Sequence, residues 1–150
     1  MIRPIVMLDD DPYKSIEALY DIDVIGFPIA ISQTLLSAWH RIKPGTFSKM
    51  LNLIDGDDIW LDWVLASKGN YEDLWNYGMD IMDEHTHRFG SRATVPYRHG
   101  SFATMTRLQS VPDLPQLGLM SPYPGKGREG YKSKGNFFKH TYREVPEWLK

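Results

Sequence analysis

Glycine and proline are spread unevenly along this chain of 150 residues, and their positions limit what it can fold into. They recur throughout residues 91–136, where they interrupt any long helix or strand. Residues 1–90 instead carry apolar side chains at the three- and four-residue spacing of amphipathic helices. We therefore expect a mainly α protein with a single domain spanning residues 1–150. It combines a compact helical bundle with a long irregular C-terminal wrap over residues 91–150.

The expected helices begin at recognisable capping residues. The aspartates from Asp9 to Asp11 can cap a helix that begins at Pro12, because carboxylates suit the positive end of a helix. A second helix is expected over about residues 24–42, and Pro28 limits where it can start, since a proline inside a helix costs about 3 kcal/mol. Further helices are expected over residues 58–67, 71–89 and 101–109, with a break at Gly69-Asn70 between the first two of these.

Charge divides the chain at about residue 90. Residues 1–90 hold 15 acidic and 7 basic side chains, whereas residues 91–150 hold 4 acidic and 10 basic ones. The basic segment is either an arm for an anionic partner or a tail that packs on its own acidic domain. The second interpretation is favoured, because a chain of net charge −2 is a poor nonspecific DNA binder. Residues 126–150 nevertheless alternate basic and aromatic side chains, as single-strand nucleic-acid contacts do.

The absence of some residue types and segments also limits the function. There is no cysteine, so a disulfide framework and a thiolate metal site are excluded. No apolar run approaches the ~20 residues that span a bilayer, and the N-terminus lacks the pattern of a signal peptide. His85 and His87 lie two residues apart on an expected helix and should point to opposite sides. We therefore expect a soluble cytoplasmic protein with no metal site, no cofactor and no membrane partner.

Several sequence blocks resemble a known family when they are taken together. The opening block reads Asp-Asp-Asp-Pro at Asp9 to Pro12 and ends in Ala-Trp-His-Arg at Ala38 to Arg41. The other blocks are Trp63-x-x-x-Ser67-x-x-Asn70-Tyr71, Asp83-Glu84-x-x-x-Arg88-Phe89-Gly90, Pro112-Asp113-Leu114-Pro115 and Arg143-Glu144-Val145-Pro146-Glu147-Trp148. In this order they resemble small viral, phage-type proteins of the pyrimidine-dimer DNA glycosylase-like family. The blocks span most of the chain.

The resemblance implies a catalytic pair near the N-terminus. Enzymes of the family attack the sugar with their N-terminal amine, whose pKa near 7.7–8 makes it a better nucleophile than lysine at neutral pH. A glutamate exchanges the protons. In this sequence the matching groups are the amine of Met1 and the carboxylate of Asp23. Ile22 and Gly26 stand where the family carries basic residues that contact DNA.

A second candidate site consists of polar residues on otherwise apolar helices. Glu84 and Arg88 are four residues apart and share a helix face, and His40 ends the long helix where it could meet that face. With His40 and Glu84 as catalytic groups, the substrate-binding residues would be Arg41, Trp63, Ser67, Asn70, Tyr71 and Arg88. Such a pocket could stack and hydrogen-bond a nucleobase. The alternative is a satisfied buried polar network in which the tryptophans belong to the core.

Two functions follow from these observations. The first is a phage-type protein that acts on DNA bases or nucleotides, including damaged or modified thymine, in the cytoplasm of its host. Its partner would be DNA or a nucleotide. The alternative is a noncatalytic viral binding protein that engages a host protein, with the acidic surface of residues 1–90 imitating nucleic-acid charge.

Overall fold

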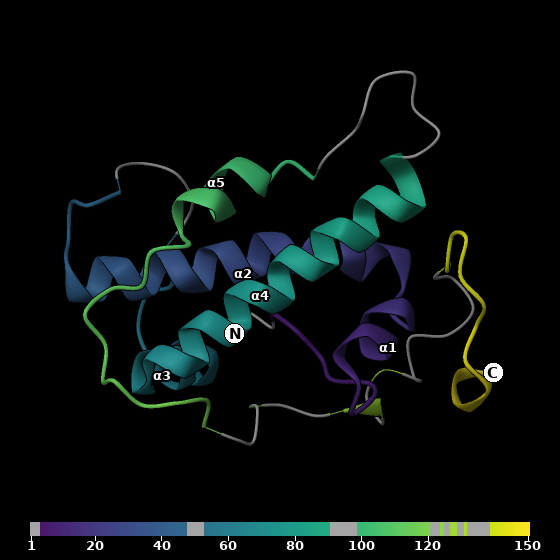
Figure 1. Ribbon diagram of the computed structural model, residues 1–150, viewed down its shortest axis with the longest axis horizontal. Helices are drawn as coiled ribbons and strands as arrows, with labels where there is room; N and C mark the ends of the chain where they lie inside the picture. Colours follow the sequence, from purple (N-terminus) through teal and green to yellow (C-terminus); the bar gives the residue numbers. More distant parts are fainter. Residues whose placement is uncertain are drawn as a thin grey trace.

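A computed structural model describes residues 4–47, 53–90, 99–120, 124, 127, 128, 131 and 139–150, and these residues contain helices and no strand (Figure 1). The helices are α1 (Pro12–Glu17), α2 (Asp21–Ile42), α3 (Ile59–Ala66), α4 (Lys68–His85) and α5 (Phe102–Arg107). A π-helical turn, η1 (Thr86–Gly90), continues α4, and a 3-10 turn, η2 (Glu147–Leu149), lies near the C-terminus. The mainly α fold predicted from the sequence is confirmed.

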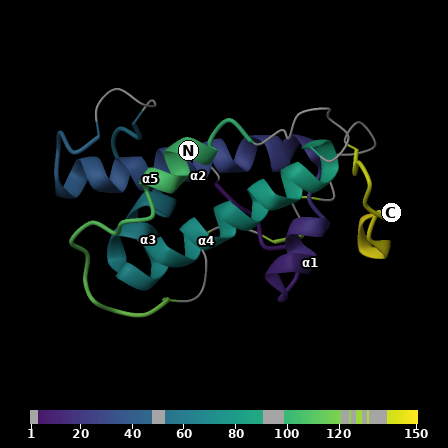
Figure 2. The same ribbon diagram turned by 45° about the horizontal axis from the view of Figure 1, so that its top comes forward.

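The long helices α2 and α4 cross each other and organise the rest of the bundle. Helix α3 packs against both of them, while α1 and α5 each pack against α4. Figures 1 and 2 show α1 at one end of this arrangement and α3 at the other. Helix α4 contacts every other α-helix, so residues at different positions along it contact different parts of the chain.

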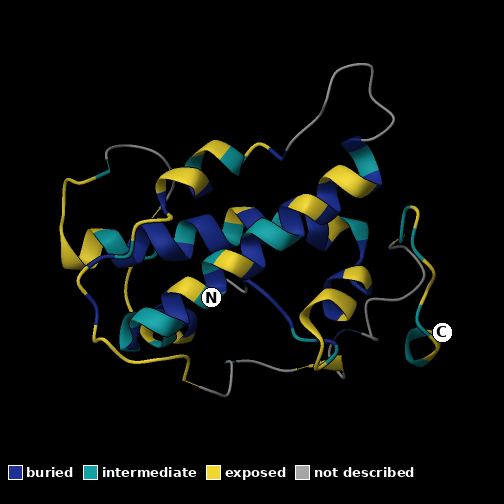
Figure 3. Ribbon diagram, viewed as in Figure 1, coloured by how far each residue is buried: buried dark blue, intermediate teal, exposed yellow. Residues whose placement is uncertain are grey.

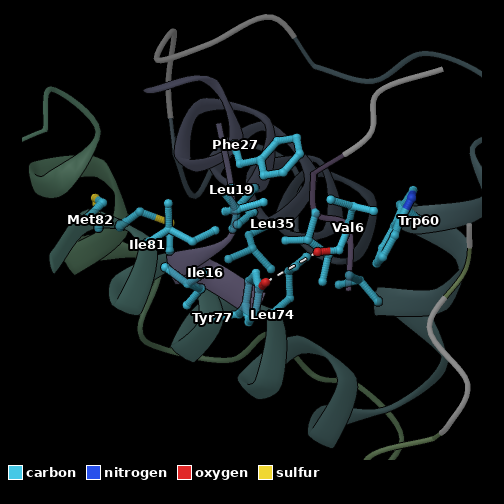
Figure 4. Packing of buried hydrophobic residues seen from close by; sticks show 14 of the residues in the cluster. Val6, Ile16, Leu19, Phe27, Leu35, Trp60, Leu74, Tyr77, Ile81 and Met82 are labelled. Carbon is cyan, nitrogen blue, oxygen red and sulfur yellow. Dashed lines mark hydrogen bonds between the residues drawn. The ribbon is translucent and has the colours of Figure 1, made fainter. Parts of the chain in front are cut away.

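The core lies where α1, α2 and α4 face one another (Figure 4). Leu19, Leu35, Leu74 and Ile81 are fully buried there, and burying a side chain of this size stabilises the fold by roughly 1.5–3 kcal/mol. The buried faces of the helices turn toward each other, as the colours of Figure 3 show. The apolar spacing that predicted the helices therefore also marks the face by which they pack.

An extended N-terminal segment runs into this core. Val6 and Leu8 are buried, and the backbone N–H of Leu8 donates to Ser15 Oγ at 2.9 Å. Ser15 Oγ in turn lies 3.0 Å from the hydroxyl of Tyr77 on α4. Burial raises the pKa of Tyr77 to about 12, so this hydroxyl stays protonated. The first described residues are thus fixed to both α1 and α4.

Helix α2 contains Pro28, as the expected range of residues 24–42 does, but it starts three residues earlier than expected. It begins at Asp21, seven residues before the proline, because Val24, Ile31 and Leu35 form a continuous buried stripe whose packing outweighs the proline penalty. The carbonyl of Ile25, one turn before Pro28, receives a hydrogen bond of 2.6 Å from His99 Nε2.

His99 is held as one tautomer by this contact. A carbonyl can only accept, so Nε2 carries the proton. The other ring nitrogen, Nδ1, accepts from the backbone N–H of Ser101 at 3.0 Å.

The other helix boundaries differ from expectation by a few residues. Asp11 caps α1 and Pro12 is its first residue, as predicted. The expected break at Gly69-Asn70 lies instead at Ser67, whose hydroxyl caps α4 by accepting from the N–H of Asn70. α5 falls within the expected range.

Helix α2 is also long and apolar enough to cross a membrane by length and composition alone, which the sequence reading did not anticipate. However, 61% of the apolar 18-residue stretch of α2 is buried inside the protein, as in the core helix of a soluble fold.

The C-terminal part is largely irregular where it is described. Residues 108–120 follow the outside of α3 and α4, and residues 139–150, here called the tail, lie beside α1 in both views (Figures 1 and 2). Much of the expected wrap between residues 121 and 138 lies outside the described residues.

Candidate functional site

A fully buried guanidinium joins α1, α2 and α4. Arg88 is 1% exposed and lies in η1, directly after α4. Its Nε donates to Glu84 Oε2 at 2.7 Å, and its Nη1 donates to Asp21 Oδ1 at 3.0 Å. Its remaining hydrogen bonds reach carbonyls at the end of α1 and two residues beyond it, those of Ile16 (3.3 Å), Glu17 (3.1 Å) and Leu19 (2.7 Å). All the N–H groups of the guanidinium are therefore used by the protein itself.

Glu84 binds a second arginine, which comes from the tail. Arg143 Nε donates to Glu84 Oε2 at 2.8 Å, and Arg143 Nη2 donates to Oε1 at 2.7 Å. Burial alone would raise the pKa of Glu84, but the hydrogen bonds and charges of Arg143 and Arg88 outweigh it and lower that pKa. The same bidentate pair raises the pKa of Arg143. Glu84 is therefore an ionised carboxylate with both oxygens engaged.

Asp21 fixes the tail to the start of α2. Its carboxylate accepts from the backbone N–H of Thr141 at 2.9 Å and from the Thr141 hydroxyl at 2.5 Å. Its own backbone N–H donates to the carbonyl of Lys139 at 2.7 Å. His140 Nε2 donates to the carbonyl of Ala18 at 2.7 Å. In its described residues, the basic tail packs on its own domain.

We call Asp21, Glu84, Arg88 and Arg143 the charged cluster. A cavity of about 530 Å³, the α1–tail cavity, opens beside it between α1 and the tail. Arg143 belongs to both, since its guanidinium binds Glu84 and also lines the cavity. The other described lining residues are Asp9, Lys14, Glu17, Ala18, Arg128, Tyr142, Glu144, Pro146 and Trp148.

Basic and aromatic groups lie together on the wall of this cavity. The guanidinium of Arg128 stacks 4.5 Å from the ring centre of Trp148, and its Nε donates to the carbonyl of Leu8 at 2.5 Å. Tyr142 is exposed, and its φ of 59° lies in the left-handed region of backbone conformation, which residues other than glycine rarely adopt. Such a conformation costs roughly 1–2 kcal/mol per residue. Strain of this kind concentrates where function fixes a side chain.

Asp23, two residues after Asp21 on α2, does not belong to the charged cluster. It is 8% exposed, and the hydroxyl of Tyr131 donates to its carboxylate. That hydroxyl accepts from the N–H of Tyr20 at 2.6 Å, and the two tyrosine rings stack with their centres 4.7 Å apart. Burial and the charge of Asp23 raise the pKa of Tyr131. Met1, the predicted partner of Asp23, lies outside the described residues.

The expectation that His40 meets Glu84 is wrong. His40 is exposed near the C-terminal end of α2, whereas Glu84 contacts the same arginine as Asp21 at the N-terminal end. Nineteen residues of helix separate Asp21 from His40, which is roughly 28 Å at 1.5 Å per residue. Arg41, beside His40, donates to the carbonyl of Gly56 at 2.7 Å and so fixes the turn before α3.

Three further predicted binding residues hold the protein's own backbone at the corner between α3 and α4. Trp63 Nε1 donates to the carbonyl of Met120 at 2.9 Å. Ser67 Oγ donates to the carbonyl of Gly118 at 2.9 Å, and Asn70 Oδ1 accepts from the N–H of Met120 at 2.7 Å. These contacts clamp residues 115–120 onto the start of α4 instead of lining a pocket with Glu84.

Tyr71 is likewise occupied. Its buried hydroxyl donates to the carbonyl of Leu108 at 2.6 Å and accepts from Trp39 Nε1 at 3.0 Å. Burial raises its pKa. Of the six predicted binding residues, only Arg88 lies in the charged cluster, so the single predicted pocket is divided among separate parts of the fold.

His85 and His87 point to opposite sides, as their spacing predicts: His85 is buried against His99, with ring centres 4.9 Å apart, and His87 is exposed. Among the described residues, no group of three or more His, Asp or Glu side chains is placed to hold a metal ion.

The sequence interpretation missed Asp21 and Arg143. Both lie in blocks that carry the family resemblance, Asp21 in the opening stretch and Arg143 in the last block. Opposite charges in separate blocks were the available signal. The ion pair between Glu84 and Arg143 was not predictable, because 59 residues separate them along the chain.

In comparisons with known proteins, no family model matches this chain, and neither does a curated protein or a solved structure. Its function is therefore inferred from the geometry of the charged cluster and the cavity beside it.

Proposed function

We propose that the protein binds a nucleotide unit in the α1–tail cavity and acts on DNA bases or nucleotides in the cytoplasm of a phage-infected host. The unit is a free nucleotide or one residue of single-stranded DNA. One observation carries this proposal: charged residues from separate blocks of the family resemblance meet in one cluster beside the cavity. They are Asp21 from the opening stretch, Glu84 and Arg88 from a middle block, and Arg143 from the last block.

The size and lining of the cavity suit a nucleotide. Its volume of about 530 Å³ falls within the roughly 300–1,000 Å³ of small-molecule sites. Lys14, Arg128 and Arg143 offer cationic donors to a phosphate. Tyr142 and Trp148 offer aromatic rings for a base, and base–aromatic stacking is worth about 1–3 kcal/mol.

The outer face of α2 supports a small or single-stranded ligand over duplex DNA. Ile22, Ile25 and Ile29 are 52%, 45% and 41% exposed at helical spacing. Ile22 and Gly26 stand where the resembling family has DNA-contacting basic residues, and Ile25 directly precedes Gly26. An apolar helix face gives no phosphate contacts, which supply much of the affinity for duplex DNA. The cations that line the α1–tail cavity are candidates for phosphate contacts.

The geometry favours a positioning role for Glu84. A general acid or base works best with a pKa near the working pH and an oxygen open to the substrate, whereas the pKa of Glu84 is lowered and both of its oxygens accept from guanidiniums. We infer that it fixes Arg143 at the cavity wall. If the chain also performs the imine chemistry of the resembling enzymes, Asp23 is the carboxylate to which the resemblance assigns the proton exchange.

Nucleotide binding can be measured directly by titrating the protein with thymidine monophosphate and with a short oligo-dT strand at low salt. Lys14→Ala is expected to weaken binding about tenfold, the loss of one charge-assisted contact. Lys68→Ala is the matched control, because Lys68 pairs with Glu72 at the start of α4, away from the cavity. Equal affinities of the two variants, or no binding at low salt, would contradict the proposal.

Imine chemistry needs a separate experiment. Borohydride should trap a covalent adduct on DNA that contains an abasic site or a thymine dimer if the N-terminal amine attacks the sugar. Loss of the adduct in Asp23→Asn, with unchanged binding, would support the acid–base role of Asp23. The absence of any adduct would remove the lyase mechanism and leave the binding proposal in place.

A noncatalytic viral protein that engages a host protein is the second candidate. The exposed isoleucine face of α2 favours it, because apolar helix faces suit protein contacts better than phosphate contacts. Complete absence of nucleotide binding at low salt would favour this alternative over the first proposal.

A further inference from the structure

We infer that the α1–tail cavity selects a ligand with a single phosphate group and discriminates against nucleoside triphosphates. This inference rests on the proposed function, and it names the class of nucleotide that the cavity takes. It follows from the balance of charge around the cavity and from the contacts its cations already make.

The described lining residues carry equal numbers of opposite charges. Lys14, Arg128 and Arg143 are the cations, and Asp9, Glu17 and Glu144 are the carboxylates. Sites built for polyphosphates surround them with an excess of cations, backbone N–H groups or a bound Mg²⁺. The formal charge of the described lining residues is zero, so they cannot neutralise several phosphate groups at once.

Two of the three cations already hold carboxylates. Arg128 Nη2 lies 3.4 Å from Asp9 Oδ2. Arg143 binds Glu84 in bidentate fashion, and its Nη1 lies 3.8 Å from Glu17 Oε1. For Lys14 the structure gives no ion pair within the described part of the chain. Lys14 is exposed on α1, so its ammonium is the cation best able to bind one phosphate without losing an existing partner.

The carboxylates make each further phosphate unfavourable. Glu144 neighbours Arg143 in the tail, and Glu17 is half-exposed on α1, so both can approach a ligand that fills the cavity. Two like unit charges about 6 Å apart lower affinity roughly threefold even in bulk water, and more in a partly buried site. The two additional charges of a triphosphate therefore predict affinity at least about tenfold below that of a monophosphate.

The aromatic wall defines the other end of the ligand. One face of Trp148 is covered by the Arg128 guanidinium, which fixes the ring against that side of the cavity. Tyr142 is held in its left-handed conformation on the same wall. A base that contacts these rings leaves its phosphate within the region lined by Lys14 and Arg143. A nucleoside without phosphate should therefore still bind, but more weakly.

Calorimetric titration in EDTA tests the selectivity, because EDTA prevents Mg²⁺ from masking the triphosphate charge. The ligands are thymidine, thymidine monophosphate, thymidine triphosphate and the dinucleotide TpT. We expect both single-phosphate ligands to bind at least about tenfold more tightly than the triphosphate. A monophosphate that binds more tightly than TpT identifies free nucleotides as the source, and the reverse order identifies single-stranded DNA.

Two variants connect the selectivity to named residues. Glu144→Gln should improve triphosphate affinity by about threefold or more while changing monophosphate affinity less. Lys14→Met should reduce monophosphate affinity to that of thymidine, whereas Lys68→Met, the matched control, should leave it unchanged. Monophosphate affinity should fall as salt concentration rises, because salt screens the attraction between the phosphate and Lys14.

The outcomes separate this inference from the proposed function. If none of the four ligands binds at low salt, the proposed function fails. If triphosphate binds as tightly as monophosphate in EDTA, or if Glu144→Gln leaves their ratio unchanged, the inference is refuted while nucleotide binding stands.

Discussion

Replacing the buried arginine gives the sharpest test of the charged cluster. In Arg88→Met, the carboxylates of Asp21 and Glu84 lose their buried cation, and the last carbonyls of α1 lose their donors. Removing one partner of a buried ion pair typically costs about 3–5 kcal/mol. For a chain of this length each kcal/mol lowers Tm by about 2–4 °C, so Tm should fall by roughly 6–20 °C.

The matched comparison is Arg143→Met. This side chain is 27% exposed, and Glu84 keeps its bond to Arg88 when it is removed. We expect a loss of only about 1–2 kcal/mol, the value of a charge-assisted hydrogen bond near the surface. Arg88→Lys keeps a positive charge but loses the planar fork, and it should lie between the two. It remains informative if Arg88→Met does not fold.

The assay is urea unfolding followed by far-ultraviolet circular dichroism at pH 7, with thermal melts in parallel. The reasoning is refuted if Arg88→Met changes the free energy of unfolding by less than about 1 kcal/mol, or if Arg143→Met costs more than Arg88→Met. A second readout is acid titration. Because the two arginines lower the pKa of Glu84, their stabilisation is present above the unfolded pKa of 4.5 and is lost as pH falls through the lower folded value. In Arg143→Met this dependence should become shallower.

Other variants test separate features. Gly69→Ala should destabilise the fold by more than about 2 kcal/mol, because an added Cβ would lie 2.3 Å from the backbone of Gly118. Gly26→Ala should stabilise α2 by up to about 1 kcal/mol, because an added Cβ would meet nothing within 4 Å. Equal effects of the two variants on urea unfolding would contradict this contrast. Tyr142→Gly should relieve the left-handed backbone, with a gain of up to about 1 kcal/mol in stability and a loss of nucleotide affinity in the same titrations; a loss of stability would argue against strain. Burial, with the nearby charge of His99, lowers the pKa of His85, so the unfolded chain binds more protons and stability should decline as pH falls below the unfolded value of 6.5. In His85→Phe, urea unfolding between pH 7.5 and 5.5 should show a smaller decline, and an unchanged slope would rule out this histidine as its source.

Local chemistry predicted most of the helices and little of the site. Asp11 with Pro12, and the apolar spacing of α4, are signals within a few residues, and the corresponding helices are present. The start of α2 was expected three residues too late, because the proline penalty is local, whereas burial of the α2 stripe depends on helices far along the chain. Propensity fixes a helix only where packing does not oppose it.

The site depends on contacts that no periodicity encodes. Glu84 and Arg88 were predicted to pair because four residues of helix separate them, and they do. His40 was placed with them although it lies at the far end of α2, because the sequence does not show which end of one helix meets another. Asp21 and Arg143 join the charged cluster only when the tail packs against α1 and α2. Polar residues such as Ser67 and Asn70 looked like ligand contacts because their backbone partners lie about fifty residues away.

The guanidinium at the end of α1 also sets an order of events during synthesis. The carbonyl of Leu19 receives its donor from a residue 69 positions later in the chain, so a ribosome adding about 5–20 residues per second exposes the first helix for several seconds before Arg88 exists. A short helix with unsatisfied carbonyls is unstable on its own in water. The outer wall of the cavity is made still later, from residues 139–150. A nascent chain can therefore assemble the crossing of α2 and α4 first, while the cavity forms only after residues 139–150 have been synthesised.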